Sequence, residues 1–495
     1  MGESNSSYLE VERKFDVLDS TVSPSFDGLS AVSRVERSPA QHLDAVYYDT
    51  PNRDLAAHRI TLRRRTGGPD AGWHLKLPAG PDARKEVRAP LGSAVEDPVP
   101  DSLRDVVLAI VRDRPLAPVA RISTERTVDM LYGPDGAALA EFCDDQVTAR
   151  AEDDGPVQQW REWELELADG GDRDLLGRLA NRLLDAGAVP AGHGSKLARV
   201  LGTTGAEAPE PPDDPIHRAV AELVDELLVW DRAVRADVYD SVHQMRVTTR
   251  KIRSLLQSSE GAFGLTDDAW ILDELRQLAA VLGVARDAEV LAEKYEKALD
   301  ELPAELVRGP VRERLVGGAK KRYAAGHRRS VIAMRSARYF RLLDALEALV
   351  AAIPPPVPAG DEEAAEATID SAYRRVRKAA KAAKAIKSEE SETERDEALH
   401  RIRKRAKRLR YTASATGAAK VADRAKSIQT LLGDHQDSVV SRAHLSKEAL
   451  AAHAAGEDTF TYGVLYQLED ELARRAEADL GAALKKLAKA VRKYT

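Results

Sequence analysis

The sequence predicts an α+β multidomain protein with a strand-rich N-terminal part and an all-α C-terminal part. Between residues 8 and about 168, apolar and polar residues alternate in short runs, and Gly, Pro and Asp separate several of these runs. This pattern is typical of antiparallel strands joined by turns. From Ile216 onward the chain is rich in Ala, Leu, Arg, Lys and Glu, with apolar residues three and four positions apart, as in helices. An acidic, Pro-rich stretch at 204–215 is predicted to link the two parts.

Composition excludes several classes of protein. Of the 495 residues, 43% are hydrophobic and 31% are charged, a balance typical of soluble globular domains. No apolar run approaches the ~18 residues of a membrane span, so we expect no membrane partner. The net charge of −7 argues against a protein that coats nucleic acid. Cys143 is the only cysteine, which excludes intramolecular disulfides and cysteine-based zinc sites and favours a cytoplasmic location.

The predicted strands carry charged residues at alternate positions. Glu10, Glu12 and Lys14 share one face of the first strand, and a late strand has acids at 162, 164 and 166. On the middle strands, bases alternate at 63 and 65 and at 74 and 76. For a single strand, a solvated polar face opposite a buried one is the favoured interpretation. Taken together, the strands also permit a closed barrel whose polar faces turn inward.

Such a barrel would enclose bases on some strands and acids on others. Enclosed charges are costly unless they are paired or liganded. A phosphate chain with Mg²⁺ or Mn²⁺ would satisfy both sets, because arginine forks match phosphate oxygens and carboxylates hold hard cations. We therefore expect an anion-binding tunnel with a divalent cofactor, and no serine–histidine or cysteine–histidine pair needs to be invoked as a nucleophile.

An ordered set of motifs across about 200 residues resembles the CYTH, or triphosphate-tunnel, family. The set comprises EVERK at 10–14, LRRR at 62–65, HLK at 74–76, ERTV at 125–128, WELEL at 163–167 and GSKLARVL at 194–201. This family includes inorganic triphosphatases, thiamine triphosphatases and class IV adenylyl cyclases. The resemblance implies an antiparallel eight-stranded β tunnel over residues 1–203 that binds a triphosphate end to end.

The resemblance also implies roles for individual residues. The chemistry would be metal-assisted attack of water on a terminal phosphoryl group, with Glu10, Glu12 and Lys14 in the catalytic group. The metal ligands would be the acids Glu10, Glu12, Glu141, Asp145, Glu164 and Glu166. The phosphate-binding bases would be Lys14, Arg63, Arg65, Lys76, Arg88, Arg121, Arg126 and Lys196.

Two predicted helices of the second part concentrate their bases on one face. In each helix four basic residues follow at i, i+3, i+7 and i+10, a stripe about 80° wide. The stripes consist of His243, Arg246, Arg250 and Arg253, and of His400, Arg403, Lys407 and Arg410. A solvated basic face is the usual interpretation of one such helix. Like charges this close weaken a helix unless an anion lies over them, so the repetition favours a polyanion site.

The helical part also contains an internal repeat. A Pro-rich break at 353–363 divides it into two arms, about 216–352 and 362–495, in which LGVARDAEVL at 282–291 pairs with LGDHQDSVVS at 432–441. Residues 216–495 resemble the CHAD domain, the conserved-histidine α-helical domain. The resemblance implies two pseudo-symmetric four-helix units whose basic helices bind inorganic polyphosphate. Flanking bases would extend the stripes, namely Lys251, Lys404 and Arg408.

We therefore expect a metal-dependent inorganic triphosphatase or short-chain polyphosphatase with a C-terminal polyphosphate-binding helical domain. Two alternatives stay open: a non-catalytic polyphosphate-binding protein, and a tunnel enzyme that processes nucleotides or thiamine triphosphate. The acids favour an enzyme, because binding alone would need only bases. Nucleic acid is not expected as a partner, since only 5% of residues are aromatic and few could stack on bases.

Overall fold

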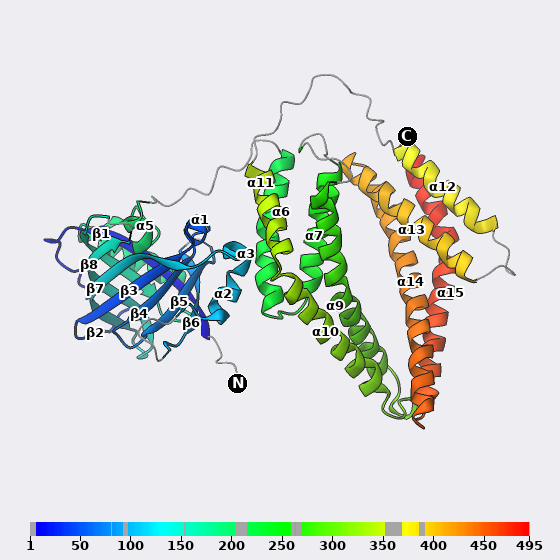
Figure 1. Cartoon of the computed structure of the whole chain (residues 1–495), viewed down its shortest axis with the longest axis horizontal. Coiled ribbons are helices and arrows are strands. Elements are labelled where there is room, and N and C mark those ends of the chain that lie inside the picture. Colours follow the sequence, from blue (N-terminus) through cyan, green and yellow to red (C-terminus); the bar gives the residue numbers. More distant parts are fainter. Residues whose placement is uncertain are drawn as a thin grey trace, which may run out of the picture. The chain divides into compact units, whose positions relative to one another are not determined.

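The computed structural model describes residues 6–80, 82–92, 98–152, 155–202, 215–258, 263, 269–351, 369–385 and 392–494. The chain forms two compact units (Figure 1). The first comprises Met1–Leu282 with Arg329–Pro355, and the second comprises Gly283–Arg328 with Pro356–Thr495. Most of the predicted linker at 204–215 and the predicted break at 353–363 lie outside the described residues.

The N-terminal part is a closed antiparallel barrel of eight strands. Its strands are β1 (Ser6–Val17), β3 (Gln41–Asp49), β4 (Thr61–Thr66), β5 (Gly72–Pro78), β6 (Ala83–Ala89), β7 (Ala117–Tyr132), β8 (Ala138–Ala151) and β9 (Gln158–Leu167). They follow the order β1-β6-β5-β4-β3-β7-β8-β9, and pairing between β1 and β9 closes the ring. Two short strands add to it, β2 (Arg34–Arg37) beside β7 and β10 (Val189–Pro190) beside β1. The prediction of an eight-stranded antiparallel barrel is confirmed.

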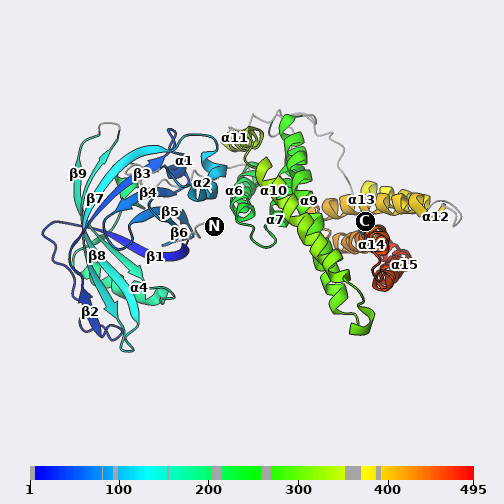
Figure 2. The ribbon, with the colours of Figure 1, turned by 60° about the horizontal axis from the view of Figure 1, so that its bottom comes forward.

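Apolar packing on the outside of the barrel explains why the polar faces turn inward. Helix α4 (Arg173–Asp185) buries Leu175, Leu179 and Leu183 in one cluster with Phe15 and Trp163 of the strands. Figure 2 shows this helix along the outside of the barrel. Because successive strand residues point to opposite faces, covering the apolar face leaves the charged face toward the lumen.

Four shorter helices complete the barrel part. They are α1 (Asp54–Ala57), α2 (Asp101–Val106), α3 (Leu108–Val111) and α5 (Lys196–Val200). Ser195 caps α5 by accepting a hydrogen bond from the backbone N–H of Ala198 at 3.1 Å. Leu197 and Val200 of this helix pack in a cluster with Trp160 of β9, which fixes Lys196 at the helix start. The anchored helix therefore sets the position of that lysine.

From Pro215 onward the described residues are mainly helical, as predicted. The first unit holds α6 (Pro215–Arg235), α7 (Ser241–Ser258), the start of α9 (Trp270–Asp300) and α11 (Ala337–Ala351). The second unit holds the remainder of α9, most of α10 (Gly318–Ala333), α12 (Ile369–Ala385), α13 (Glu392–Ala415), α14 (Ala419–Ala454) and α15 (Phe460–Val491). A 3-10 turn at Ala304–Leu306 and a π-helical turn at Glu313–Gly317 lie between α9 and α10.

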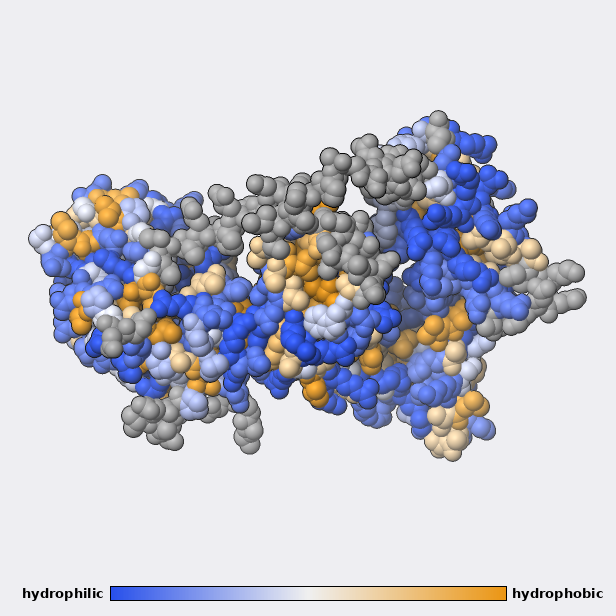
Figure 3. All heavy atoms as spheres, turned by 45° about the horizontal axis from the view of Figure 1, so that its top comes forward, coloured by the Kyte–Doolittle hydropathy of each residue, from blue (hydrophilic) through white to orange (hydrophobic). Residues whose placement is uncertain are grey.

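Helices α12 to α15 form a four-helix unit around one apolar core. Val376, Ile402, Ile428 and Leu487, one from each helix, are buried in the same cluster. Within the first arm, α7 and α9 correspond in sequence to α13 and α14. Hydrophilic side chains cover most of the visible surface in Figure 3. None of the described helices combines the length and the apolar character needed to cross a membrane.

Candidate functional site

The barrel lumen contains a cavity of about 490 Å³ lined mainly by charged side chains. Most of the residues predicted for the tunnel meet there. The lining includes Glu10, Glu12, Lys14, Arg63, Arg65, Lys76, Arg88, Arg126, Glu141, Glu164, Glu166 and Lys196. The alternation seen in the sequence thus gathers side chains from seven barrel strands and the start of α5 around one space.

Asp145 lies behind the lining rather than in it. Its side chain is fully buried and binds Arg126 through two parallel hydrogen bonds of 2.7 Å. Lys196 Nζ lies 2.8 Å from Asp145 Oδ2, the oxygen that also accepts from Arg126 Nη2. Burial alone would raise the pKa of Asp145, but Arg126 and Lys196 outweigh it and lower that pKa. Asp145 therefore holds two bases of the cavity wall in position.

Arg121 is not part of the cavity, contrary to the sequence-based expectation. It lies on β7, as Arg126 does, but five positions away, so the two side chains point to opposite faces of the strand. The Arg121 side chain is 65% exposed and its Nε lies 2.6 Å from Glu152 Oε1 on the outer surface. We therefore withdraw Arg121 from the phosphate-binding set.

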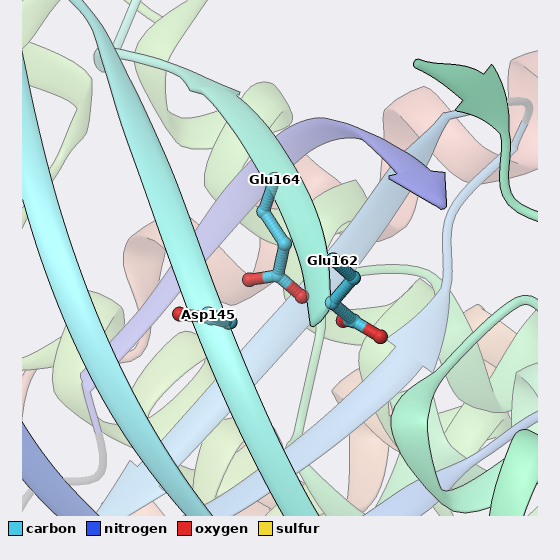
Figure 4. Close-up of side chains that lie close together, drawn as sticks. All are labelled: Asp145, Glu162 and Glu164. Carbon is cyan, nitrogen blue, oxygen red and sulfur yellow. The ribbon is translucent and has the colours of Figure 1, made fainter. Parts of the chain in front are cut away.

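One candidate metal-binding group is the acidic triad of Asp145, Glu162 and Glu164 (Figure 4). Each residue offers a carboxylate oxygen, and these oxygens lie within 4.8 Å of one another. Lys196 Nζ already contacts all three, at 2.8, 2.7 and 2.7 Å. Glu164 additionally pairs with Arg126 at 2.6 Å and with Lys14. A cation bound here would have to displace bases that already neutralise the triad.

A second acidic group lies on β1, β8 and β9 and is less well neutralised. Glu166 stands directly opposite Glu12 on β1 and Glu141 on β8, and like charges opposite each other are unfavourable. No cation contacts Glu166 among the residues that the structure describes. Burial, followed by repulsion from Glu10, raises the pKa of Glu166 to about 8. This group, Glu10, Glu12, Glu141 and Glu166, suits a bound divalent cation.

Glu10 and Glu12 of this acidic group also orient lysines of the cavity. Glu10 is 3% exposed; its Oε1 accepts a hydrogen bond from Tyr8 at 3.1 Å and its Oε2 lies 2.5 Å from Lys76 Nζ. Glu12 accepts a hydrogen bond of 3.0 Å from Lys14. Burial opposes ionisation of Glu12, but Lys14 and Lys76 outweigh it and hold its pKa at about 2. Glu12 is thus ionised at neutral pH and available to a metal.

Three arginines of the cavity lie on β4 and β7, the strands on either side of β3. Arg63 donates a hydrogen bond of 3.3 Å to the Tyr47 hydroxyl, and no carboxylate pairs with it in the described part of the chain. Its Nε is buried without a partner. Burial and then the nearby Arg63 and Arg126 lower the pKa of Arg65 to about 9, which still leaves it charged at neutral pH. Carboxylates contact Arg65 and Arg126, so Arg63 is the guanidinium of this set that a bound anion would complement.

Several cavity residues were not predicted as site residues. Arg84 and Glu86 alternate with Arg88 on β6, so strand parity could have found Arg84, whose Nη2 donates to Gly194 O. Glu86 does not line the cavity but lies behind it, fully buried; it accepts from Arg88 at 2.5 Å and lies 2.8 Å from His74 Nδ1. Tyr8 and Asp70 also line the cavity. Asp70 lies in the loop between β4 and β5, where no alternation of polar and apolar residues could indicate a site residue.

In the first arm, the predicted basic stripe lies on α7. His243, Arg246 and Arg253 are half-buried, whereas Arg250 and Lys251 are exposed. Arg246 Nε donates to the backbone carbonyl of Ala279 on α9 at 3.3 Å. Lys251 Nζ lies 3.8 Å from Glu226, a weak contact at the surface.

In the second arm, the stripe on α13 binds neutral amides of α14. His400 Nδ1 and Arg403 Nη1 both contact Gln436 Oε1, at 2.8 and 3.0 Å, and Arg410 donates to Gln429 at 3.2 Å. Glutamine orients these side chains without cancelling their charge. Gly433 leaves room for Arg403, since a Cβ there would lie 3.2 Å from its Nη2. The other stripe residues are half-buried Lys407 and exposed Lys404 and Arg408.

Comparison with known proteins assigns both parts of the chain. The model of the CYTH domain matches residues 9–187, and that of the CHAD domain matches residues 218–446. The chain is a CYTH–CHAD protein. It is 67% identical over 503 residues to the uncharacterized protein Rv2226 of Mycobacterium tuberculosis, covering 98% of each chain. The CYTH family includes triphosphatases and adenylate cyclase-like enzymes, and CYTH and CHAD domains are associated with triphosphate and polyphosphate binding.

Solved structures similar to this CYTH–CHAD protein include two that align with more than half of the chain. The CHAD domain from the plant Ricinus communis is 22% identical with a TM-score of 0.40, covering 55% of this chain and 90% of that one. PptA from Streptomyces chartreusis is 19% identical with a TM-score of 0.44, covering 56% of this chain and 100% of that one.

Proposed function

We propose that the CYTH barrel hydrolyses inorganic triphosphate or short polyphosphate with Mg²⁺ or Mn²⁺, and that the CHAD part binds polyphosphate. One observation carries the proposal. Among the described residues, the cavity holds a half-buried base that no carboxylate contacts, Arg63, and a half-buried acid that no base contacts, Glu166. A phosphate chain and a divalent cation would complement the two together, whereas either ligand alone would leave one side uncompensated.

The bases of the cavity would bind and orient the phosphate chain. Arg63, Arg65 and Arg126 present a guanidinium wall, and Lys76 and Arg88 lie on the neighbouring strands. Their positive charge is preorganised, so it can stabilise the negative charge that develops as the phosphoanhydride bond breaks. Lys14 and Lys196 stand next to the acids and would contact the chain from that side.

The acids Glu10, Glu12, Glu141 and Glu166 would hold the cation. A divalent ion there would neutralise phosphate oxygens and help to activate water. The residues fit this role because no cation of the described residues contacts Glu166, which faces two other acids across the strands. Asp145 and Glu164, also predicted as ligands, are engaged by Arg126 and Lys196, so we assign them to holding those bases.

Phosphate release from purified full-length protein tests the proposed activity. Tripolyphosphate with Mg²⁺ or Mn²⁺ should yield orthophosphate, and Glu12→Gln should reduce the rate by at least about a hundredfold, since it removes a charged group of the metal site. Arg121→Ala, on the outer surface, serves as the control and should leave the rate unchanged. ATP and thiamine triphosphate in parallel distinguish inorganic from organic substrates. Absence of release with both metals would leave a polyphosphate-binding protein.

A further inference from the structure

A carboxylate of the protein itself occupies one end of the arginine wall. Asp70 belongs to the loop between β4 and β5 and lines the cavity. Its Oδ2 forms an ion pair with Arg65 and lies 3.7 Å from Arg88 Nη2. Both arginines are among the bases that we assign to the phosphate chain. An entering anion and the Asp70 carboxylate would therefore compete for the same guanidinium groups.

The loop backbone is built to place Asp70 there. Gly67 and Gly68 both have positive φ, and a Cβ on Gly67 would lie 2.1 Å from the carbonyl oxygen of His42. Only glycine fits such a close approach in this conformation. The Asp70 carbonyl contacts His74 Nε2 at 3.0 Å, and His74 is itself held by Glu86. The carboxylate thus extends from a loop that is fixed at both its start and its end.

Asp70 differs from Asp145, which pairs with another arginine of the cavity. Asp145 is fully buried and binds Arg126 through two hydrogen bonds, so removing it would leave a buried charge unpaired. The Asp70 side chain is 32% exposed and approaches Arg88 only at long range. Its partner Arg65 is only 6% exposed, but water reaches the Asp70 carboxylate, so an anion with more charge can replace it.

We propose that Asp70 is an internal competitor that limits how tightly the tunnel holds phosphate. A phosphate group displaces the carboxylate from Arg65 and Arg88 on binding, and the carboxylate returns to them when product leaves. This inference rests on the proposed function of the barrel and assigns Asp70 the control of substrate affinity and product release. It touches no covalent step, so its effect falls on KM and product inhibition.

Asp70→Asn in the full-length protein tests the proposal, because asparagine keeps the shape and removes the charge. We expect tripolyphosphate, titrated calorimetrically in metal-free buffer, to bind on the order of fivefold more tightly. With metal, KM should fall by a similar factor while kcat does not rise, and orthophosphate should inhibit more strongly. Asp82→Asn is the matched control, since it removes the same charge from the exposed Arg13 pair at 3.1 Å.

The outcomes separate the possibilities. Equal or weaker binding by folded Asp70→Asn overturns the proposal, as does an equal gain in Asp82→Asn, which would indicate a general charge effect. Asp70→Ala provides the same comparison if the asparagine variant does not fold. Tighter binding without any turnover supports the role of Asp70 and rejects the proposed hydrolysis alone. If neither wild type nor variant binds tripolyphosphate, both proposals fail.

Discussion

Arg63 is a cavity base that no carboxylate contacts among the described residues. Its guanidinium is enclosed by the barrel and meets a tyrosine hydroxyl in place of a carboxylate. Replacing it should therefore affect ligand binding more than folding. We expect Arg63→Ala to weaken tripolyphosphate binding by about 10- to 100-fold, the range of a lost charged hydrogen-bonding partner. Titration calorimetry measures this change, and an affinity as high as that of Arg121→Ala would contradict it.

Glu166 should make the metal-free protein sensitive to alkaline pH. Its pKa of about 8 in the folded state exceeds the 4.5 of an ordinary glutamate, so the unfolded chain gives up this proton more readily. The folded state therefore loses stability as pH rises from about 4.5 to 8. In chelator, Glu166→Gln should melt a few degrees above wild type at pH 8.5, with a smaller difference at pH 5.

Adding Mn²⁺ should reverse that order of melting temperatures. Wild type gains stability from the bound cation, whereas the variant lacks one ligand and gains less. Melting curves across pH, with and without Mn²⁺, provide the measurement. Glu162→Gln, in the triad held by Lys196, separates the two acidic groups. If Mn²⁺ stabilisation disappears in Glu162→Gln and persists in Glu166→Gln, the cation belongs to the triad instead.

At the scale of elements, strand parity predicted most of the cavity. Glu12 stands opposite Glu166 and Lys14 opposite Glu164 because two alternating strands pair side by side in one sheet. The same alternation explains why the prediction for Arg121 was wrong. Arg121 lies five positions from Arg126 on β7, so its side chain points to the outer face of the barrel. Whether an inward acid reaches the cavity or stays behind it, as Asp145 does, depends on packing depth that periodicity does not encode. Loop residues such as Asp70 follow no alternating pattern from which their direction could be predicted.

Helix α13 allows its basic stripe to be tested as one surface. Arg403 is held by Gln436 and packs over Gly433, which fixes its charge in one place. Arg401 is exposed on the same helix and lies 3.7 Å from Glu397. We expect Arg403→Gln to weaken polyphosphate binding severalfold and to flatten its dependence on salt, while Arg401→Gln has a smaller effect. Filter binding across a salt series would show this, and equal losses would indicate a diffuse basic surface.

At the scale of the whole molecule, binding and hydrolysis are assigned to different domains. Substitutions in the two domains should therefore have separable effects. Full-length protein with Arg403→Gln and Arg246→Gln together should hydrolyse tripolyphosphate at the wild-type rate but bind long-chain polyphosphate poorly. Glu12→Gln should hydrolyse tripolyphosphate poorly but bind long-chain polyphosphate as the wild type does. A loss of tripolyphosphate turnover in the helical double variant, with its melting temperature unchanged, would contradict the separation.

The pairing of β1 with β9 has a consequence for how the protein is made. The Lys14 and Glu164 side chains that meet across this seam stand 150 residues apart in the chain. β9 must therefore leave the ribosome before β1 can pair with it. Until then the barrel is open and the charged inner faces of its strands are exposed to water. Nascent chains that end before Leu167 should consequently have no closed cavity and no site for phosphate. The cavity is therefore among the last features of its domain to form.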